Sequence, residues 1–134
     1  MQATAQFGCV TGGVKTVLRL EGLAVLTAAV FIYWHAGFSW MQFGILFLAP
    51  DITFAAYLFG PRAGAAAYNA AHSTNGALGL AVAAVALNQP LMIAVALIGL
   101  AHIGFDRALG YGLKYGKGFG FTHLGRIGRN AKES

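Results

Sequence analysis

The sequence predicts an all-α integral membrane protein: a four-helix bundle with both termini in the cytoplasm and a glycine-rich interfacial loop at its C-terminal end. The 134 residues are 57% hydrophobic and 10% charged, whereas a soluble domain carries roughly 25% charged residues. Four stretches are long and apolar enough for helices that cross a bilayer, which need about 20 residues each. The nine lysines and arginines all lie in or beside segments that four spans would place on one side. The chain is therefore interpreted as a single membrane domain, 1–134.

The predicted spans are separated by short turn-forming segments. They run over about 17–35, 40–59, 63–87 and 91–109. Pro61 and Pro90 stand at helix starts, where a missing N–H costs little. Pro50 lies inside the second span and predicts a kink there. The third span is rich in glycine and alanine, which favours close packing in the bundle or a homodimer seam.

The tail, 110–134, contains many glycines and aromatic residues, which disfavour a firm helix and suit a loop along the cytoplasmic membrane surface. Because lysine and arginine favour the cytoplasmic side, we expect both termini to be cytoplasmic. The net charge of +5 then reflects topology and attraction to lipid phosphates. We expect membrane lipids as partners and no nucleic acid.

Polar side chains fall in the cytoplasmic half of the predicted spans. Counted at about 1.5 Å per residue, Asp51, His72 and His102 lie roughly 13–15 Å from the cytoplasmic edge. His102 and Asp106 are four residues apart and share one helix face. Such residues are costly inside a membrane, about 2.5–3.5 kcal/mol each for charged ones, and normally face the bundle interior with a partner. The depths therefore predict a shared buried cluster.

This cluster suggests a metal-dependent membrane enzyme that acts on a lipid-soluble or interfacial substrate. Histidine and carboxylate sets with open positions suit Zn, Mn or non-haem Fe, which activate water or oxygen. The candidate metal ligands are Asp51, His72, His102, Asp106 and His123. His123 belongs to this set if the tail folds back under the bundle. The candidate supporting or catalytic residues are Glu21, Tyr68 and Asn69.

Other functions remain open at this point, and so does the question whether the chain is an enzyme. The carboxylates and histidines suit a small proton- or cation-coupled transporter. His72 and His102 could alternatively hold haem b across the bundle in an electron-transfer role. In a fourth interpretation the buried groups only satisfy one another and fix the helix register.

Several words in fixed order resemble a known family. They are LAPD (48–51), GPRAGAAAYNAAH (60–72), AHIGFDRALGYGLKY (101–115) and THLG (122–125). Together they are similar to the domain-of-unknown-function family 4260, small bacterial multi-pass membrane proteins. The family pattern has an acidic residue before the Thr-His pair, where this chain has Phe121. The resemblance implies a multi-pass protein of a bacterial inner membrane and no particular activity.

Overall fold

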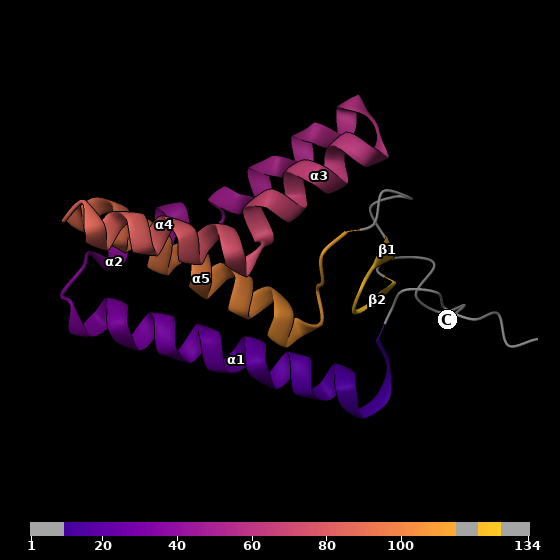
Figure 1. Cartoon of the computed structure of the whole chain (residues 1–134), viewed down its shortest axis with the longest axis horizontal. Helices are drawn as coiled ribbons and strands as arrows, with labels where there is room; N and C mark the ends of the chain where they lie inside the picture. The colour runs from indigo at the N-terminus through magenta and orange to yellow at the C-terminus, as the bar shows by residue number, and fades with distance from the viewer. Residues whose placement is uncertain (1–9, 115–120, 127–134) are drawn as a thin grey trace, which may run out of the picture.

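The computed structural model describes residues 10–114 and 121–126, which are helical apart from a small antiparallel hairpin (Figure 1). The elements in chain order are α1 (Gly12–His35), α2 (Trp40–Leu46), a 3-10 helix η1 (Ala49–Phe59), α3 (Pro61–His72), α4 (Thr74–Ala86), α5 (Pro90–Leu109), β1 (Phe121–Thr122) and β2 (Gly125–Arg126). Helix α5 is the central element, because it packs against both α1 and α4. The pair formed by η1 and α3 leans away from them in Figure 1.

Three segments are long and apolar enough to cross a membrane: α1, α2 together with η1, and α5. Large apolar side chains cover much of the outer surface, and Leu58 and Phe59 are 87% and 85% exposed. A water-soluble protein rarely exposes such continuous apolar surface, so this exterior fits contact with lipid. The closed four-helix bundle and the cytoplasmic position of the termini stay predictions.

The prediction of one continuous third span is wrong, because the chain breaks at Ser73 between α3 and α4. Ser73 has extended backbone angles (φ −81°, ψ 129°), and its hydroxyl accepts a hydrogen bond from the Asn75 amide as the cap of α4. Serine favours this position because its oxygen satisfies an amide at the start of the next helix. The break gives two short helices of different direction (Figure 1).

A second interruption lies near Pro50, where a kink was expected. Helix α2 ends at Leu46, and the chain resumes at Ala49 as a 3-10 helix with a proline in its first turn. The hydroxyl of Thr53 donates to the carbonyl of Pro50 at 2.7 Å. Both interruptions therefore have their own local hydrogen bonds.

Close contact between α1 and α5 depends on two glycines. A Cβ atom on Gly104 would lie 2.5 Å from the amide nitrogen of Leu26 and 2.6 Å from the carbonyl oxygen of Gly22. At Gly22, a Cβ atom would overlap the Cβ atom of Arg107. Small residues allow helix backbones to approach in this way inside membranes.

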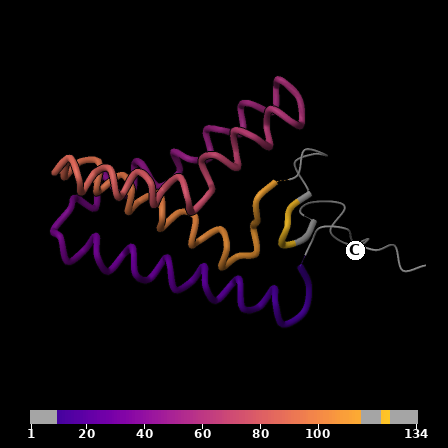
Figure 2. Tube along the Cα trace, viewed as in Figure 1, coloured from indigo at the N-terminus to yellow at the C-terminus, as the bar shows by residue number. Residues whose placement is uncertain are grey.

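The C-terminal segment turns back toward the ends of the helices after α5 (Figure 2). The amide of Val10, just before α1, donates to the carbonyl of His123 at 2.8 Å, so the hairpin adjoins the start of α1. The expected interfacial loop is described at 110–114 and 121–126. Its remaining residues, 115–120 and 127–134, lie outside the described part of the chain.

Candidate metal centre

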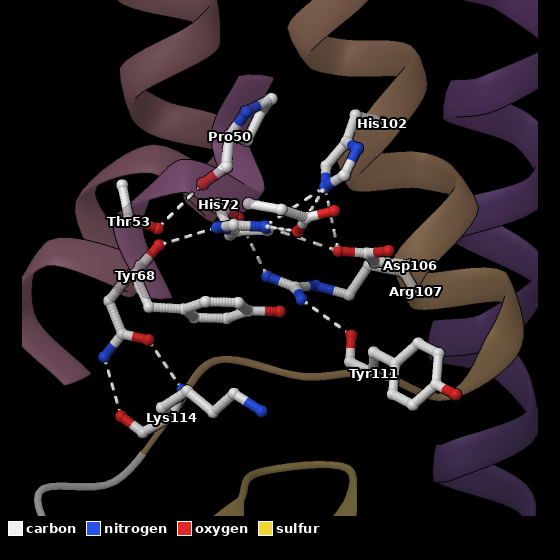
Figure 3. Close-up of polar contacts among 11 residues, drawn as sticks. Pro50, Thr53, Tyr68, His72, His102, Asp106, Arg107, Tyr111 and Lys114 are labelled. Atoms are coloured by element: carbon white, nitrogen blue, oxygen red, sulfur yellow. Dashed lines mark hydrogen bonds and ion pairs between the residues drawn. The ribbon is translucent and has the colours of Figure 1, made fainter. Parts of the chain in front are cut away.

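The two chain interruptions and α5 bring four polar side chains to one point. Asp51 stands in the first turn of η1, just after the first interruption, and His72 is the last residue of α3, just before the second. His102 and Asp106 come from α5, one turn apart. Figure 3 shows His72, His102 and Asp106 pointing toward one another.

The four side chains each direct one ligand atom inward, and these atoms all lie within 4.8 Å of one another. The Nε2 atoms of His72 and His102 are 3.1 Å apart. Asp51 Oδ1 lies 3.3 Å from the first and 3.4 Å from the second. Asp106 Oδ2 lies 3.5 Å and 3.3 Å from the same two nitrogens.

The His72 ring is held by the residue one turn before it. Its Nδ1 lies 2.9 Å from the backbone carbonyl of Tyr68, which can only accept, so Nδ1 carries the proton of a neutral ring. The Nε2 lone pair then points into the cluster. The Tyr68 ring also stacks on the imidazole, with centroids 3.7 Å apart and planes 10° apart.

His102 has an apolar setting. The Phe47 ring meets its imidazole edge-on, with centroids 5.2 Å apart. Its Nδ1 atom is buried and has no hydrogen-bond partner among the described residues. Both imidazoles are fully enclosed, at 0% and 1% exposure. By contrast, the Asp51 side chain is 33% exposed and forms the open edge of the cluster.

A second set of contacts ties the C-terminal segment beneath the cluster. Arg107 donates to the carbonyl of Tyr111 at 2.9 Å and to that of His72 at 3.2 Å, so it satisfies the carbonyl that the end of α3 leaves free (Figure 3). Asn69 accepts from the amide of Lys114 at 2.6 Å and donates to its carbonyl at 2.7 Å. These bonds keep residues 110–114 close to α3.

Lys114 lies beneath the Tyr68 ring, with its Nζ atom 4.8 Å from the centroid. The residue is 4% exposed. Burial lowers the pKa of Lys114 to about 8, against an opposing contribution from Asp106. A positive charge is thus held at the base of the site at neutral pH.

Two of the predicted site residues lie elsewhere. Neither Glu21 nor His123 belongs to the four-residue cluster among the described residues. Both instead line a cavity of about 550 Å3 between α1, α4 and α5. The Nδ1 of His123 accepts a hydrogen bond from the amide of Leu113 at 2.9 Å.

Two residues near the cluster were not among the predicted site residues: Arg107, which directly follows Asp106, and Lys114, which belongs to the predicted C-terminal loop. The signal for Arg107 was its position directly after Asp106 on a helix with few other charges. For Lys114 no local signal exists, because its burial depends on the return of the segment after Gly110.

Comparison with known proteins gives one match. A family model described as "Domain of unknown function (DUF4260)" matches residues 15–127. No curated protein and no solved structure matches the chain.

Proposed function

The chain belongs to the DUF4260 family, and we propose that Asp51, His72, His102 and Asp106 bind a divalent metal ion in a membrane-embedded enzyme. The observation that carries this proposal is the spacing of the four inward-facing ligand atoms. Ligands that surround a tetrahedral ion at about 2.0–2.2 Å lie about 3.3–3.6 Å from one another. Five of the six separations, from 3.1 to 3.5 Å, fall at or near this range, and all of the ligand atoms lie within 4.8 Å of one another.

A metal-free network of protonated histidines explains these distances less well. Charge-assisted hydrogen bonds between a ring nitrogen and a carboxylate are typically about 2.7–2.9 Å long. All four nitrogen–oxygen distances are 3.3 Å or longer. The Nε2 of neutral His72 also faces two carboxylates without a proton to donate, which favours a cation between them.

Charge balance supports the same conclusion. Asp106 is buried and Asp51 is partly buried among apolar helices, and carboxylates in such a setting require compensation, because unpaired charges are very costly in a medium of low dielectric constant. A divalent cation together with two carboxylates is neutral. Two imidazoles and two carboxylates suit Zn, Fe or Mn, and the ion would act by polarising a substrate oxygen or activating water.

The open edge at Asp51 supports a catalytic rather than a purely structural ion. Four protein ligands would close a tetrahedral zinc site, so a catalytic role requires an ion such as Fe or Mn, which takes further ligands and would keep a position for water or substrate on the exposed side of Asp51. Asp51 is the most exposed of the four residues, and Ile52, beside it, is 74% exposed on an apolar surface. A substrate that enters from the membrane or its interface fits this edge.

The test is metal analysis of the full chain, purified in mild detergent without chelators. We expect about one equivalent of a transition metal in the wild type and its loss in His72→Ala and His102→Ala. His35→Ala is the matched control, because His35 is an exposed histidine at the end of α1. Retention of the ion in both cluster variants would contradict the proposal.

A proton- or cation-coupled transporter is the alternative that the same buried carboxylates support. In that case a pH gradient should drive flux in liposomes, and Asp51→Asn should abolish it. Haem b fits poorly, because two axial nitrogens must lie on opposite faces of a macrocycle. The ring nitrogens of His72 and His102 are 3.1 Å apart, which leaves no space for one.

A further inference from the structure

A second feature lies on the other side of α5: the cavity of about 550 Å3 between α1, α4 and α5. Its volume is within the range of about 300–1,000 Å3 typical of small-molecule sites. None of the four clustered residues lines it. Its function can therefore be considered apart from the metal.

The cavity is amphipathic. Leu18, Val25 and Ile103 provide apolar walls, and Gly22 and Gly104 lie where α1 and α5 meet. Four polar residues share the lining: Glu21, Thr74, Arg107 and His123. An occupant must therefore combine a hydrocarbon portion with a polar group.

Two nitrogen donors, Arg107 and His123, share the polar lining with the hydroxyl of Thr74. Arg107 donates one N–H to each of two backbone carbonyls and forms no ion pair with a carboxylate within the described residues. Its guanidinium has five N–H groups in total, so further donors remain. The His123 ring accepts through Nδ1, and its neutral form therefore carries the proton on Nε2. Burial lowers the pKa of His123, which keeps the ring neutral at pH 7.

The cavity lining also contains a negatively charged hydrogen-bond acceptor, the carboxylate of Glu21. Glu21 is an exposed carboxylate on α1, and the structure gives it no ion pair with the described residues. An anionic group alone would be attracted by Arg107 and repelled by Glu21. A headgroup with both a phosphate and an ammonium group would satisfy the donors and the acceptor together.

We propose that this cavity binds a zwitterionic phospholipid whose phosphate contacts Arg107 and His123, whose ammonium group contacts Glu21, and whose acyl chain lies along Val25 and Ile103. Polar pockets between transmembrane helices recognise lipid headgroups through such contacts. The bilayer supplies this ligand directly to the open side of the cavity. The proposal does not depend on the metal centre.

The test is native mass spectrometry of the full chain, delipidated in detergent and titrated with dioleoyl lipids of three headgroups. Phosphatidylethanolamine donates hydrogen bonds through its ammonium group, phosphatidylcholine carries a quaternary ammonium group without N–H, and phosphatidylglycerol has no cation. We expect the first phosphatidylethanolamine to bind roughly tenfold more tightly than the other two, because a charge-assisted hydrogen bond is gained. Equal affinity for all three lipids would overturn the proposal.

Three variants locate the binding. Val25→Trp fills the cavity and should abolish tight binding, whereas Val17→Trp, an exposed position on the same helix outside the cavity lining, should not change it. Glu21→Gln should lower the affinity for phosphatidylethanolamine to that for phosphatidylcholine. The same effect from both tryptophan variants, or a headgroup preference that survives Glu21→Gln, would overturn the proposal.

Two further measurements separate this site from other sources of binding. Glycerophosphoethanolamine, which has the headgroup without acyl chains, should not displace the lipid, and displacement would contradict the role of the apolar wall. The metal content of Val25→Trp should equal that of the wild type. Absence of the headgroup preference in a wild-type chain with normal metal content would overturn this inference and leave the proposed metal centre intact.

Discussion

At the scale of single residues, the side chains beside the cluster position its ligands. The Tyr68 carbonyl accepts a hydrogen bond from Nδ1 of His72 and so places the proton of the neutral ring on that nitrogen. The Tyr68 ring covers one face of the imidazole. Asn69 holds the backbone of Lys114 by two hydrogen bonds. In metal sites, contacts to the residues around the ligands orient the ligands and tune metal affinity. Of the residues predicted as supporting or catalytic, Tyr68 contacts His72 directly, whereas the hydrogen bonds of Asn69 go to the backbone of Lys114.

Lys114 predicts a pH dependence of stability. Its pKa of about 8 in the folded protein lies below the usual value of 10.5, so between these values the unfolded chain binds more protons. The free energy of unfolding should therefore rise as the pH increases from about 8 to about 10.5, by on the order of 3 kcal/mol in full. Below pH 8 the cost of the buried ammonium group is fully present.

The measurement compares thermal unfolding of the wild type and Lys114→Met in detergent at pH 7 and pH 10. Methionine keeps most of the aliphatic length of lysine without the charge. The free energy of unfolding of this variant should therefore not rise with pH through the titration of residue 114. The difference in melting temperature between wild type and variant should shift in favour of the wild type at the higher pH. Parallel changes in both proteins would show that Lys114 titrates as an ordinary surface lysine.

At the scale of elements, the apolar runs predicted the long helices well. The structure has α1 at Gly12–His35 and α5 at Pro90–Leu109, where spans at 17–35 and 91–109 were expected. The division of the third span was missed. Ser73 and Thr74 lie inside that span, and such hydroxyls commonly bond back to carbonyls within a helix. The capping role of Ser73 depends on the change of direction into α4, which local composition does not encode.

The contact between α1 and α5 predicts a position-specific effect of alanine. Gly104→Ala places a Cβ atom against the backbone of Leu26 and Gly22, which cannot move without separating the helices. Overpacking of this kind typically costs about 1–3 kcal/mol. Gly99→Ala in the same helix is the control, because its Cβ atom would lie 4.0 Å from the Cβ atom of Ala77, an ordinary contact.

Thermal unfolding in detergent measures both variants under one condition. We expect a clearly lower melting temperature for Gly104→Ala and an unchanged or slightly higher one for Gly99→Ala, since alanine is the better helix former. Loss of stability in both variants would mean that α5 needs glycine for its backbone conformation and not for close packing against α1. Tolerance of Gly104→Ala would place α1 farther from α5.

At the scale of the whole molecule, depth along the helices predicted part of the site, and rotation of the helices decided the rest. Asp51, His72 and His102 have expected depths of roughly 13–15 Å, and Asp106 has one of about 7 Å. Their ligand atoms nevertheless come together in the structure. Glu21 lies at a depth comparable to that of Asp106 but lines the cavity between α1, α4 and α5. Residue counts give the height of a side chain in a bundle. The direction that it faces depends on how each helix packs against α5.

The broken third span also leads to a test of topology. Helices α3 and α4 have 12 and 13 residues, so each spans less than the hydrocarbon core of about 30 Å, and together they reach about 37 Å. If they cross as a pair, Arg62 and Gln89 lie on opposite sides of the membrane. The basic residues predict that Arg62 is cytoplasmic.

Cysteine labelling in a Cys9→Ser background measures this arrangement. Arg62→Cys and Gln89→Cys occupy exposed positions at the two turns, so neither should disturb the packing. A membrane-impermeant maleimide should label Gln89→Cys in right-side-out vesicles and Arg62→Cys in inverted vesicles, and both after permeabilisation. Labelling of both from one side would mean that α3 and α4 do not carry the chain across. The cluster would then lie between a re-entrant pair and α5, reached from one side of the membrane.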